Sequence, residues 1–250
     1  MSINVSIITA TYNSAATIRD TMRSVSEQDY PFIEHIIVDG YSQDGTLDIV
    51  NSFSHTALVL CEKDEGIYDA LNKGIKAARG DVIGMLHSDD FYTHPGVIAK
   101  VVEAFQDESV QACYADLQYV QAQHPEKITR TWKSGHFQPR SFYWGWMPPH
   151  PTFFVRRAVY DQVGLFNTNM RTAADYEMML RVLLKHHLAA HYIPEVLVKM
   201  RAGGASNASV KNRIRANRED REAWKLNGLK PWFFTLYLKP LRKINQFILK

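Results

Sequence analysis

Short apolar runs alternate with amphipathic segments along the first part of the chain. The apolar runs are rich in Val and Ile and are bounded by Gly, Asn or Asp, which is typical of buried strands. They cover 5–11, 34–39, 57–61 and the apolar part of 80–90. Segments with apolar residues at helical spacing lie at 15–28, 46–53, 67–78 and 96–106. This alternation predicts βαβ units, and hence an α/β fold whose Rossmann-like, mostly parallel central sheet is flanked by helices.

The pattern becomes looser after a further strand at 110–114. Alternating polar and apolar residues there predict a small antiparallel portion, followed by helices and one last strand. The expected elements are strands at 117–121, 127–132 and 153–155, helices at 157–163, from 175 onward and at 211–226, and a last strand at either 190–193 or 196–200. We therefore expect one domain built from two halves, 1–116 and 117–206, with a C-terminal helical tail at 207–250.

The composition is that of an ordinary soluble globular protein, with 46% hydrophobic and 22% charged residues. Its two cysteines, Cys61 and Cys113, form no spaced framework, which favours a reducing compartment. The first residues enter a strand without the basic and apolar regions of a signal peptide, and no run has the length of a transmembrane helix.

The net charge of +3 conceals an uneven distribution. Residues 199–250 hold 13 Lys or Arg against 3 Asp or Glu, so they carry +10, and the preceding part carries −7. A basic segment on an acidic body indicates an anionic partner, either a membrane or a nucleic acid. The tail at 229–250 also mixes aromatic and aliphatic residues with Lys and Arg, which favours an interfacial membrane anchor over the alternative of a terminal helix docked on its own domain.

Carboxylates follow three of the expected strands. Asp39, Asp64 and the pair Asp89 and Asp90 come where these strands end. Because the carboxyl ends of parallel strands lie at one edge of a sheet, we expect a shared ligand site there, suited to a divalent cation that carries phosphates. Each Asp could alternatively cap a helix or a turn. Another carboxylate, Asp175, begins the amphipathic helix, and the sequence leaves open whether it or Glu177 faces a pocket.

Neither a dinucleotide-binding G-x-G-x-x-G turn nor a Walker A loop follows the first strand, so the site does not resemble an NAD or P-loop pocket. Tyr12 could still stack on a base while Asp39 accepts from a base or ribose. Arg201, beside a Gly-Gly pair, could approach a phosphate, although a flexible loop is the simpler interpretation. The aromatic stretch at 142–151, which contains Trp146 and His150, suits sugar faces and a protein core equally.

Taken together, these motifs resemble those of inverting family-two glycosyltransferases with a GT-A fold, of the kind that builds bacterial polysaccharides. The matching stretches occur in the order of the family and cover the chain from residue 5 to about 206. They are 6–13 (SIITATYN), 38–46 (VDGYSQDGT), 64–74 (DEGIYDALNKG), 88–90 (SDD), 150–152 (HPT) and 174–177 (ADYE).

The resemblance implies a role for each matching residue. The nucleoside of a nucleotide-sugar would be held by five of them: Thr9, Ala10, Tyr12, Asp39 and Asp64. Asp90 would bind Mg²⁺ or Mn²⁺, Ser88 and Asp89 would lie toward the ribose and the sugar, and Asp175 would be the catalytic base. Together with the two candidates argued above from the residues alone, Trp146 and Arg201, the motif residue His150 would contact the acceptor or a phosphate.

Three features of the motifs qualify the resemblance. Ser88 stands where relatives have Asp, and His150 is followed by Pro rather than Gln. The Q-x-x-R-W motif of processive synthases is absent, so we expect one sugar to be transferred per acceptor.

The implied partners are a nucleotide-sugar, preferably a UDP-sugar, a saccharide or lipid-linked saccharide acceptor, and an anionic membrane, without nucleic acid. A homodimer and a cytoplasmic location on the inner face of the membrane are also expected. Two other functions stay open: a sugar-phosphate nucleotidyltransferase, which usually has a Gly-rich basic loop where this chain has 12–16, and a non-catalytic nucleotide-sugar-binding protein.

Overall fold

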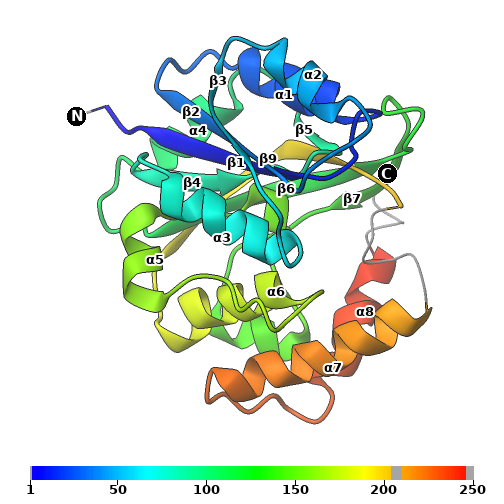
Figure 1. Ribbon diagram of the computed structural model, residues 1–250. Coiled ribbons are helices and arrows are strands. Elements are labelled where there is room, and N and C mark those ends of the chain that lie inside the picture. Colours follow the sequence, from blue (N-terminus) through cyan, green and yellow to red (C-terminus); the bar gives the residue numbers. More distant parts are fainter. Residues whose placement is uncertain (1, 204–209, 246–250) are drawn as a thin grey trace.

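The computed structural model describes residues 2–203 and 210–245. Within them, nine strands form one mixed sheet. Helices flank this sheet, as Figure 1 shows. The strand order is β3-β2-β1-β4-β8-β6-β9-β5, and β7 pairs with β6. The predicted α/β class, with helices on both faces of a mostly parallel sheet, is confirmed.

The first half alternates strands and helices as the sequence predicts. Its elements are β1 (Val5–Thr11), α1 (Ile18–Ser26), β2 (Ile33–Asp39), α2 (Thr46–Asn51), β3 (Thr56–Cys61), α3 (Ile67–Ala77) and β4 (Val82–Met85). The four strands run parallel to one another. All seven residues of β1 are buried because helices cover both of its faces, which is why this strand is a continuous apolar and β-branched run.

The second half is mixed in strand direction. Its elements are β5 (Asp90–Tyr92), α4 (Val97–Ala104), β6 (Ala112–Val120), β7 (Ile128–Trp132), η1 (Pro139–Trp144), η2 (His150–Thr152), β8 (Phe154–Arg156), α5 (Arg157–Val163), α6 (Ala174–Met179), the π-helical η3 (Leu180–Lys185) and β9 (Ala190–Arg201). The tail adds α7 (Val210–Leu226) and α8 (Thr235–Asn245).

Two strand boundaries differ from the prediction. The separate strands expected at 110–114 and 117–121 are one strand, β6, and the alternatives 190–193 and 196–200 are both parts of β9. The register of the β6–β9 pair shifts beside Ile193 and Val196, so Pro194 lies in a bulge. A bulge tolerates a proline that cannot donate to the ladder, and the break in the pattern is therefore local.

Strand β5 was not predicted. It is only three residues long and pairs antiparallel with β9, with Asp90 opposite Met200. Such a short strand has no detectable periodicity, and long-range pairing alone defines it.

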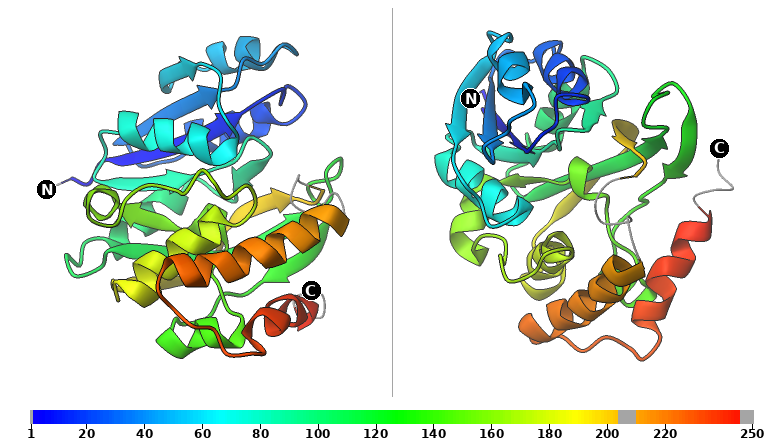
Figure 2. Two further views of the ribbon diagram at one scale, coloured as in Figure 1. Left: turned by 60° about the horizontal axis from the view of Figure 1, so that its bottom comes forward. Right: turned by 45° about the vertical axis from the view of Figure 1, so that its right-hand side comes forward.

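The described part of the tail packs on the domain. Figure 2 shows α7 lying across α6 and α8 beyond it, and the two helices contact each other. Trp224 of α7 is fully buried and donates its indole N–H to the Tyr176 hydroxyl at 2.9 Å. Helix α8 contacts η1, where a Cβ atom on Gly145 would lie 2.5 Å from the Lys239 nitrogen. Docking on the domain, which the sequence left as the alternative, is therefore the observed state up to residue 245, and 246–250 lie outside the described residues.

Candidate functional site

Asp39 lies at the end of β2, at the edge where the parallel strands stop. It is fully buried and accepts from Ser42 twice, from the backbone N–H at 2.8 Å and from the hydroxyl at 2.6 Å. These bonds fold the following loop back on the strand. The neighbouring Tyr41 has a positive φ of 64° and is 52% exposed.

Asp64 and Tyr12 meet this loop at Gly40. A Cβ atom on Gly40 would lie 2.6 Å from Asp64 Oδ2 and 3.4 Å from the Tyr12 ring. Asp64 also accepts from the Gly66 N–H at 2.9 Å, beside the first turn of α3. Tyr12 is 64% exposed, so its ring is available for stacking on a base. The structure thus brings Tyr12, Asp39 and Asp64 together.

Thr9 and Ala10 lie further inside β1, and both are buried. The Thr9 hydroxyl is hydrogen-bonded to His35 Nε2 at 3.0 Å in the sheet interior. Contact of these two residues with a nucleoside stays a prediction.

Asp90 is a buried carboxylate at the same edge of the sheet. Its side chain is fully buried, and neither carboxylate oxygen has a hydrogen-bond partner among the described residues. Burial and the neighbouring Asp89 raise the pKa of Asp90 well above its ordinary value, while Arg201 acts in the opposite direction. A buried acceptor without a donor is rare in folded proteins, and a bound cation is one way to satisfy it.

The residues around Asp90 fit a cation that also binds phosphate. In the described ranges, no group of three or more His, Cys, Asp or Glu forms a complete metal cage. Mg²⁺ is commonly held by one or two carboxylates together with substrate phosphates, because it keeps several other oxygen ligands. Asp90 matches that arrangement.

The loop that carries Ser88, Asp89 and Asp90 is held from several sides. Ser88 Oγ is 2.9 Å from Ser14 Oγ in the loop after β1. The Thr21 hydroxyl donates to the Asp90 carbonyl at 2.7 Å. Arg201, only 7% exposed, donates to the Asp89 carbonyl at 2.9 Å and forms an ion pair with Asp20. Arg201 therefore holds the loop in place through the Asp89 backbone. Its contact with a phosphate stays a prediction.

Asp175 projects from the first turn of α6 into a group of rings. It is half-buried and accepts from the Tyr68 hydroxyl at 3.2 Å. The His87 and His150 rings lie 5.4 Å apart. Burial lowers the pKa of both histidines, that of His150 to about 4, and Asp175 acts against this shift at each of them. Both rings are therefore neutral at pH 7 and within electrostatic range of the carboxylate.

Tyr119 connects the two acidic positions. Burial raises the pKa of its phenol, Arg130 opposes the shift, and Asp90 and Asp175 both add to it. Since Coulomb interactions fall off with distance, both carboxylates lie within electrostatic range of the Tyr119 phenol.

Comparison of the sequence with models of protein families identifies the family of the chain. The model described as glycosyl transferase family 2 matches residues 6–164, well over half of the chain. The chain belongs to glycosyl transferase family 2. This family membership confirms the resemblance found in the motifs.

Known proteins agree with the family assignment. A PGL/p-HBAD biosynthesis glycosyltransferase of Mycobacterium bovis is 28% identical over 211 residues, which cover 82% of this chain and 80% of the relative. S. aureus TarS, solved with UDP-GlcNAc, has a TM-score of 0.68 at 18% identity, with 90% of this chain and 65% of that chain covered. The mannosyltransferase PcManGT of Pyrobaculum calidifontis, solved with GDP-Man and Mn²⁺, has a TM-score of 0.67 at 21% identity, with 96% and 69% covered. At these identities the two structures show the GT-A fold alone.

The structure of this family-two glycosyltransferase resolves one choice that the sequence left open. Glu177 is 4% exposed, pairs with Arg181 at 2.7 Å and accepts from Asn227 at 3.0 Å. It is thus a structural residue of the α6–α7 contact. Of the two carboxylates, Asp175 is half-buried and accepts from Tyr68, so it is the candidate that stays for the base.

The two aromatic candidates of the glycosyltransferase differ in their placement. Trp146 is 4% exposed, donates its indole N–H to the Ser134 carbonyl at 2.7 Å and packs against Tyr114 and Phe137. It lies in the core, while His150 is partly exposed and within electrostatic range of Asp175. Contact of His150 with an acceptor stays a prediction.

The sequence did not single out three residues that surround Asp175. His87, directly before Ser88, and Tyr68, inside the motif at 64–74, could have been noticed from their places next to motif residues. His87 Nδ1 is buried and without a hydrogen-bond partner within the described ranges. Glu219 of α7 accepts from the N–H groups of Thr172 and Ala173, at 2.7 and 3.1 Å, and no local pattern reveals this contact.

Proposed function

We propose that this enzyme transfers one sugar from a nucleotide-diphosphate sugar, with a UDP-sugar favoured, to a hydroxyl of a saccharide or lipid-linked saccharide, with inversion at the anomeric carbon. The observation that carries the proposal is that Asp90, at the strand-end edge, is a buried carboxylate for which the described residues supply no donor, while Asp175 accepts from Tyr68 at the start of α6.

The donor lies along the strand ends. The ring of Tyr12 stacks on the base, Asp39 and Asp64 bind the nucleoside with the help of Thr9 and Ala10, and Ser88 and Asp89 lie toward ribose and sugar. Asp90 holds Mg²⁺ or Mn²⁺. When bound, such a cation neutralises the charge that develops on the leaving diphosphate. The solved complexes of TarS with UDP-GlcNAc and of PcManGT with GDP-Man and Mn²⁺ support this arrangement.

The acceptor hydroxyl enters beside Asp175. As its oxygen forms a bond to the anomeric carbon, the bond from that carbon to the diphosphate oxygen breaks, and the hydroxyl proton passes to the Asp175 carboxylate. Attack from the side opposite the leaving group inverts the carbon. Tyr68 orients the Asp175 carboxylate. The neutral rings of His87 and His150 form hydrogen bonds with the acceptor sugar and do not take the proton of its hydroxyl.

A panel of UDP-, GDP- and dTDP-sugars tests the proposal. Release of nucleoside diphosphate is measured with Mn²⁺ or Mg²⁺, with and without saccharide acceptors. We expect Asp175→Asn to lower turnover about 10²–10⁴-fold, since a general base contributes that much, while nucleotide binding is kept. Turnover of Asp175→Asn within about threefold of wild type would show that Asp175 is not the base.

The proposed cellular role is synthesis of a cell-envelope polysaccharide or glycolipid at the inner face of the cytoplasmic membrane. The name of the Mycobacterium bovis relative, which places that protein in PGL/p-HBAD biosynthesis, supports such a role. In the described part of the chain, no helix is long and apolar enough to cross a membrane. A homodimer stays a prediction.

A further inference from the structure

Exposed aromatic residues gather where η1 meets the segment before α8. Trp144, Trp232 and Phe233 are 50%, 40% and 90% exposed, and with Phe234 they line an open hollow of about 460 Å³. We call these four residues the aromatic platform. Their rings support one another: Trp144 lies 5.7 Å from Trp232 and 5.3 Å from Phe234. Two segments almost ninety residues apart thus build one apolar surface.

The platform continues along α8. Tyr237 and Leu241 lie four residues apart on one side of α8 and are 67% and 53% exposed, and Phe233 lies in the turn just before the helix. Leu236 instead packs against the core cluster of the domain. Helix α8 therefore has one apolar face on the domain and a second that faces outward.

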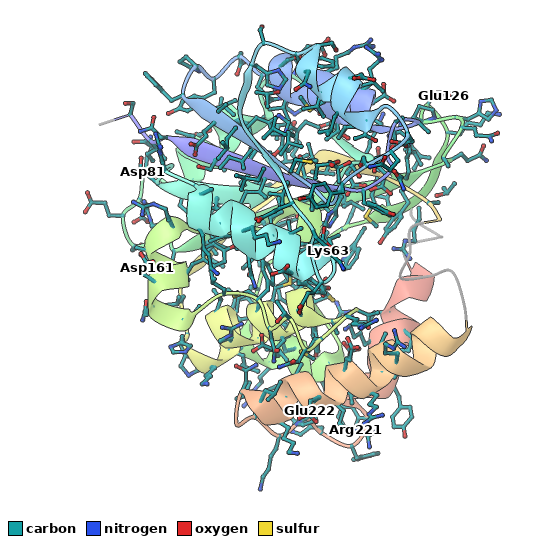
Figure 3. The ribbon with its side chains drawn as sticks, viewed as in Figure 1. Lys63, Asp81, Glu126, Asp161, Arg221 and Glu222 are labelled. Carbon is teal, nitrogen blue, oxygen red and sulfur yellow. The ribbon has the colours of Figure 1, made fainter. Side chains whose placement is uncertain are left out.

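Cations lie beside the platform. Arg221, Lys225 and Lys230 line a second hollow of about 340 Å³, which also includes Pro231, the residue before Trp232. All three side chains are exposed, and Figure 3 shows Arg221 on the outer side of α7. Arg242 is a further exposed cation on α8. The surface therefore combines large apolar rings with an adjacent cluster of positive charge.

We propose that the aromatic platform and its adjacent cations dock this protein on an anionic lipid bilayer. Trp and Tyr are favoured at the level of lipid headgroups because their rings are apolar and their tips are polar. Lysine and arginine near the surface are attracted by anionic headgroups. The charge of the tail matches this orientation, because residues 210–245, which form α7, α8 and the segment between them, have 10 Lys or Arg against 3 Asp or Glu. The bilayer contacts the basic side, and the acidic body faces away.

Helices α7 and α8 also contact α6, the helix that carries Asp175. Lys239 of α8 pairs with Asp220 of α7 at 2.6 Å and lies 3.5 Å from the ring centre of Tyr176, the neighbour of Asp175. Trp224 binds the Tyr176 hydroxyl. The membrane-facing helices are thus in direct contact with α6. If the proposed function is right, and this step rests on it, an acceptor attached to a membrane lipid reaches Asp175 without leaving the bilayer.

Vesicle flotation of the full chain tests the docking surface. We expect wild type to float with phosphatidylcholine vesicles that contain phosphatidylglycerol, to bind pure phosphatidylcholine much less, and to detach as salt is added. Phe233→Ser with Tyr237→Ser lowers partitioning about tenfold or more, because two large apolar groups are lost. Lys225→Gln with Lys230→Gln lowers it roughly 25-fold, since each cation near the surface is worth about a factor of five.

Matched controls lie outside the C-terminal tail, on β3 and α3. Leu58 of β3 is 37% exposed and Lys76 of α3 is exposed, so Leu58→Ser and Lys76→Gln make similar changes away from α8. These variants should float like wild type. Unfolding temperatures, measured for every variant, identify any loss of partitioning that comes from a loss of structure.

Three results overturn the proposal. The first is that wild type does not bind anionic vesicles, and the second is that the Phe233→Ser, Tyr237→Ser double variant binds them as well as wild type does. The third is that the protein does not bind vesicles but self-associates, and that this double variant abolishes the self-association. The last would assign the platform to a second copy of the chain. Nucleoside diphosphate release in solution is measured separately, so an inactive protein that still floats refutes the proposed function and leaves the docking surface standing.

Discussion

The hydroxyl of Tyr68 donates to Asp175 Oδ1 at 3.2 Å, which joins α3 of the first half to α6 of the second. One hydrogen bond thus connects the strand-end edge to the residue proposed as the base. Burial, followed by the charge of Asp175, raises the pKa of Tyr68 well above its ordinary value, so Tyr68 stays a donor at any pH at which the protein is folded.

Tyr68→Phe should lower kcat about tenfold and leave the KM for the nucleotide-sugar nearly unchanged. A hydrogen bond to a charged group is worth about 1.5–3 kcal/mol, and here it orients the carboxylate toward the acceptor. Steady-state kinetics with varied donor and acceptor separate the two parameters. An unchanged kcat would show that other contacts orient Asp175.

Asp90→Asn should make the metal-free protein more stable at pH 7 while reducing sugar transfer about 100-fold or more. Burial and Asp89 disfavour the charge on Asp90, so a neutral amide of the same shape relieves that cost. Each kcal/mol gained raises the unfolding temperature by about 2–4 °C for a chain of this size.

Thermal unfolding with and without Mn²⁺ and UDP checks the Asp90 prediction. Wild type should be stabilised by the two together, and Asp90→Asn should not. Equal stabilisation of both proteins would mean that Asp90 does not hold the cation.

Glu219→Ala should weaken the start of α6. Glu219 accepts from the N–H groups of Thr172 and Ala173 and from the Thr172 hydroxyl, and so satisfies donors next to the helix terminus that carries Asp175. We expect a loss of about 1–2 kcal/mol in the free energy of unfolding and a lower kcat. Glu222→Ala, three residues further along α7 and exposed, is the matched control and should change neither.

The stability of the protein should fall as pH decreases from about 6.5 toward 3. His35 is fully buried, and burial followed by the charge of His55 lowers its pKa from 6.5 to about 3. Between these pH values the unfolded chain binds a proton at His35 that the folded protein does not bind. The contribution of neutral His35 to the free energy of unfolding is therefore complete above pH 6.5 and is lost as the pH falls below it, with a limiting slope of about 1.4 kcal/mol per pH unit. His35→Leu should reduce the slope of the unfolding free energy against pH, as denaturant titrations at several pH values can measure. An unchanged slope would assign the acid sensitivity to other groups.

The sequence predicted what local patterns control. Strand β1 was expected at 5–11 and lies there, and Asp39 was expected at the end of a strand and is the last residue of β2. Asp90 was also expected at a strand end, but β4 stops at Met85 and Asp90 begins β5. Contacts between distant segments could not be predicted in this way. Helix α6 offers two carboxylates in its first turn, and only the packing of Arg181 and Asn227 against Glu177 shows that Glu177 has a structural role, which leaves Asp175 as the candidate base. Trp146 has the composition of a sugar-binding residue, but its neighbours place it in the core.

Gly145 determines whether the C-terminal helix can dock at all. Its φ of 75° disfavours other residues, and any side chain would collide with the backbone of Lys239. Gly145→Ala is therefore a way to detach α8 without altering the sequence of the helix itself. Among other members of the family, a glycine at this position should distinguish those whose C-terminal helix is held against the 3₁₀ turn from those whose helix lies elsewhere.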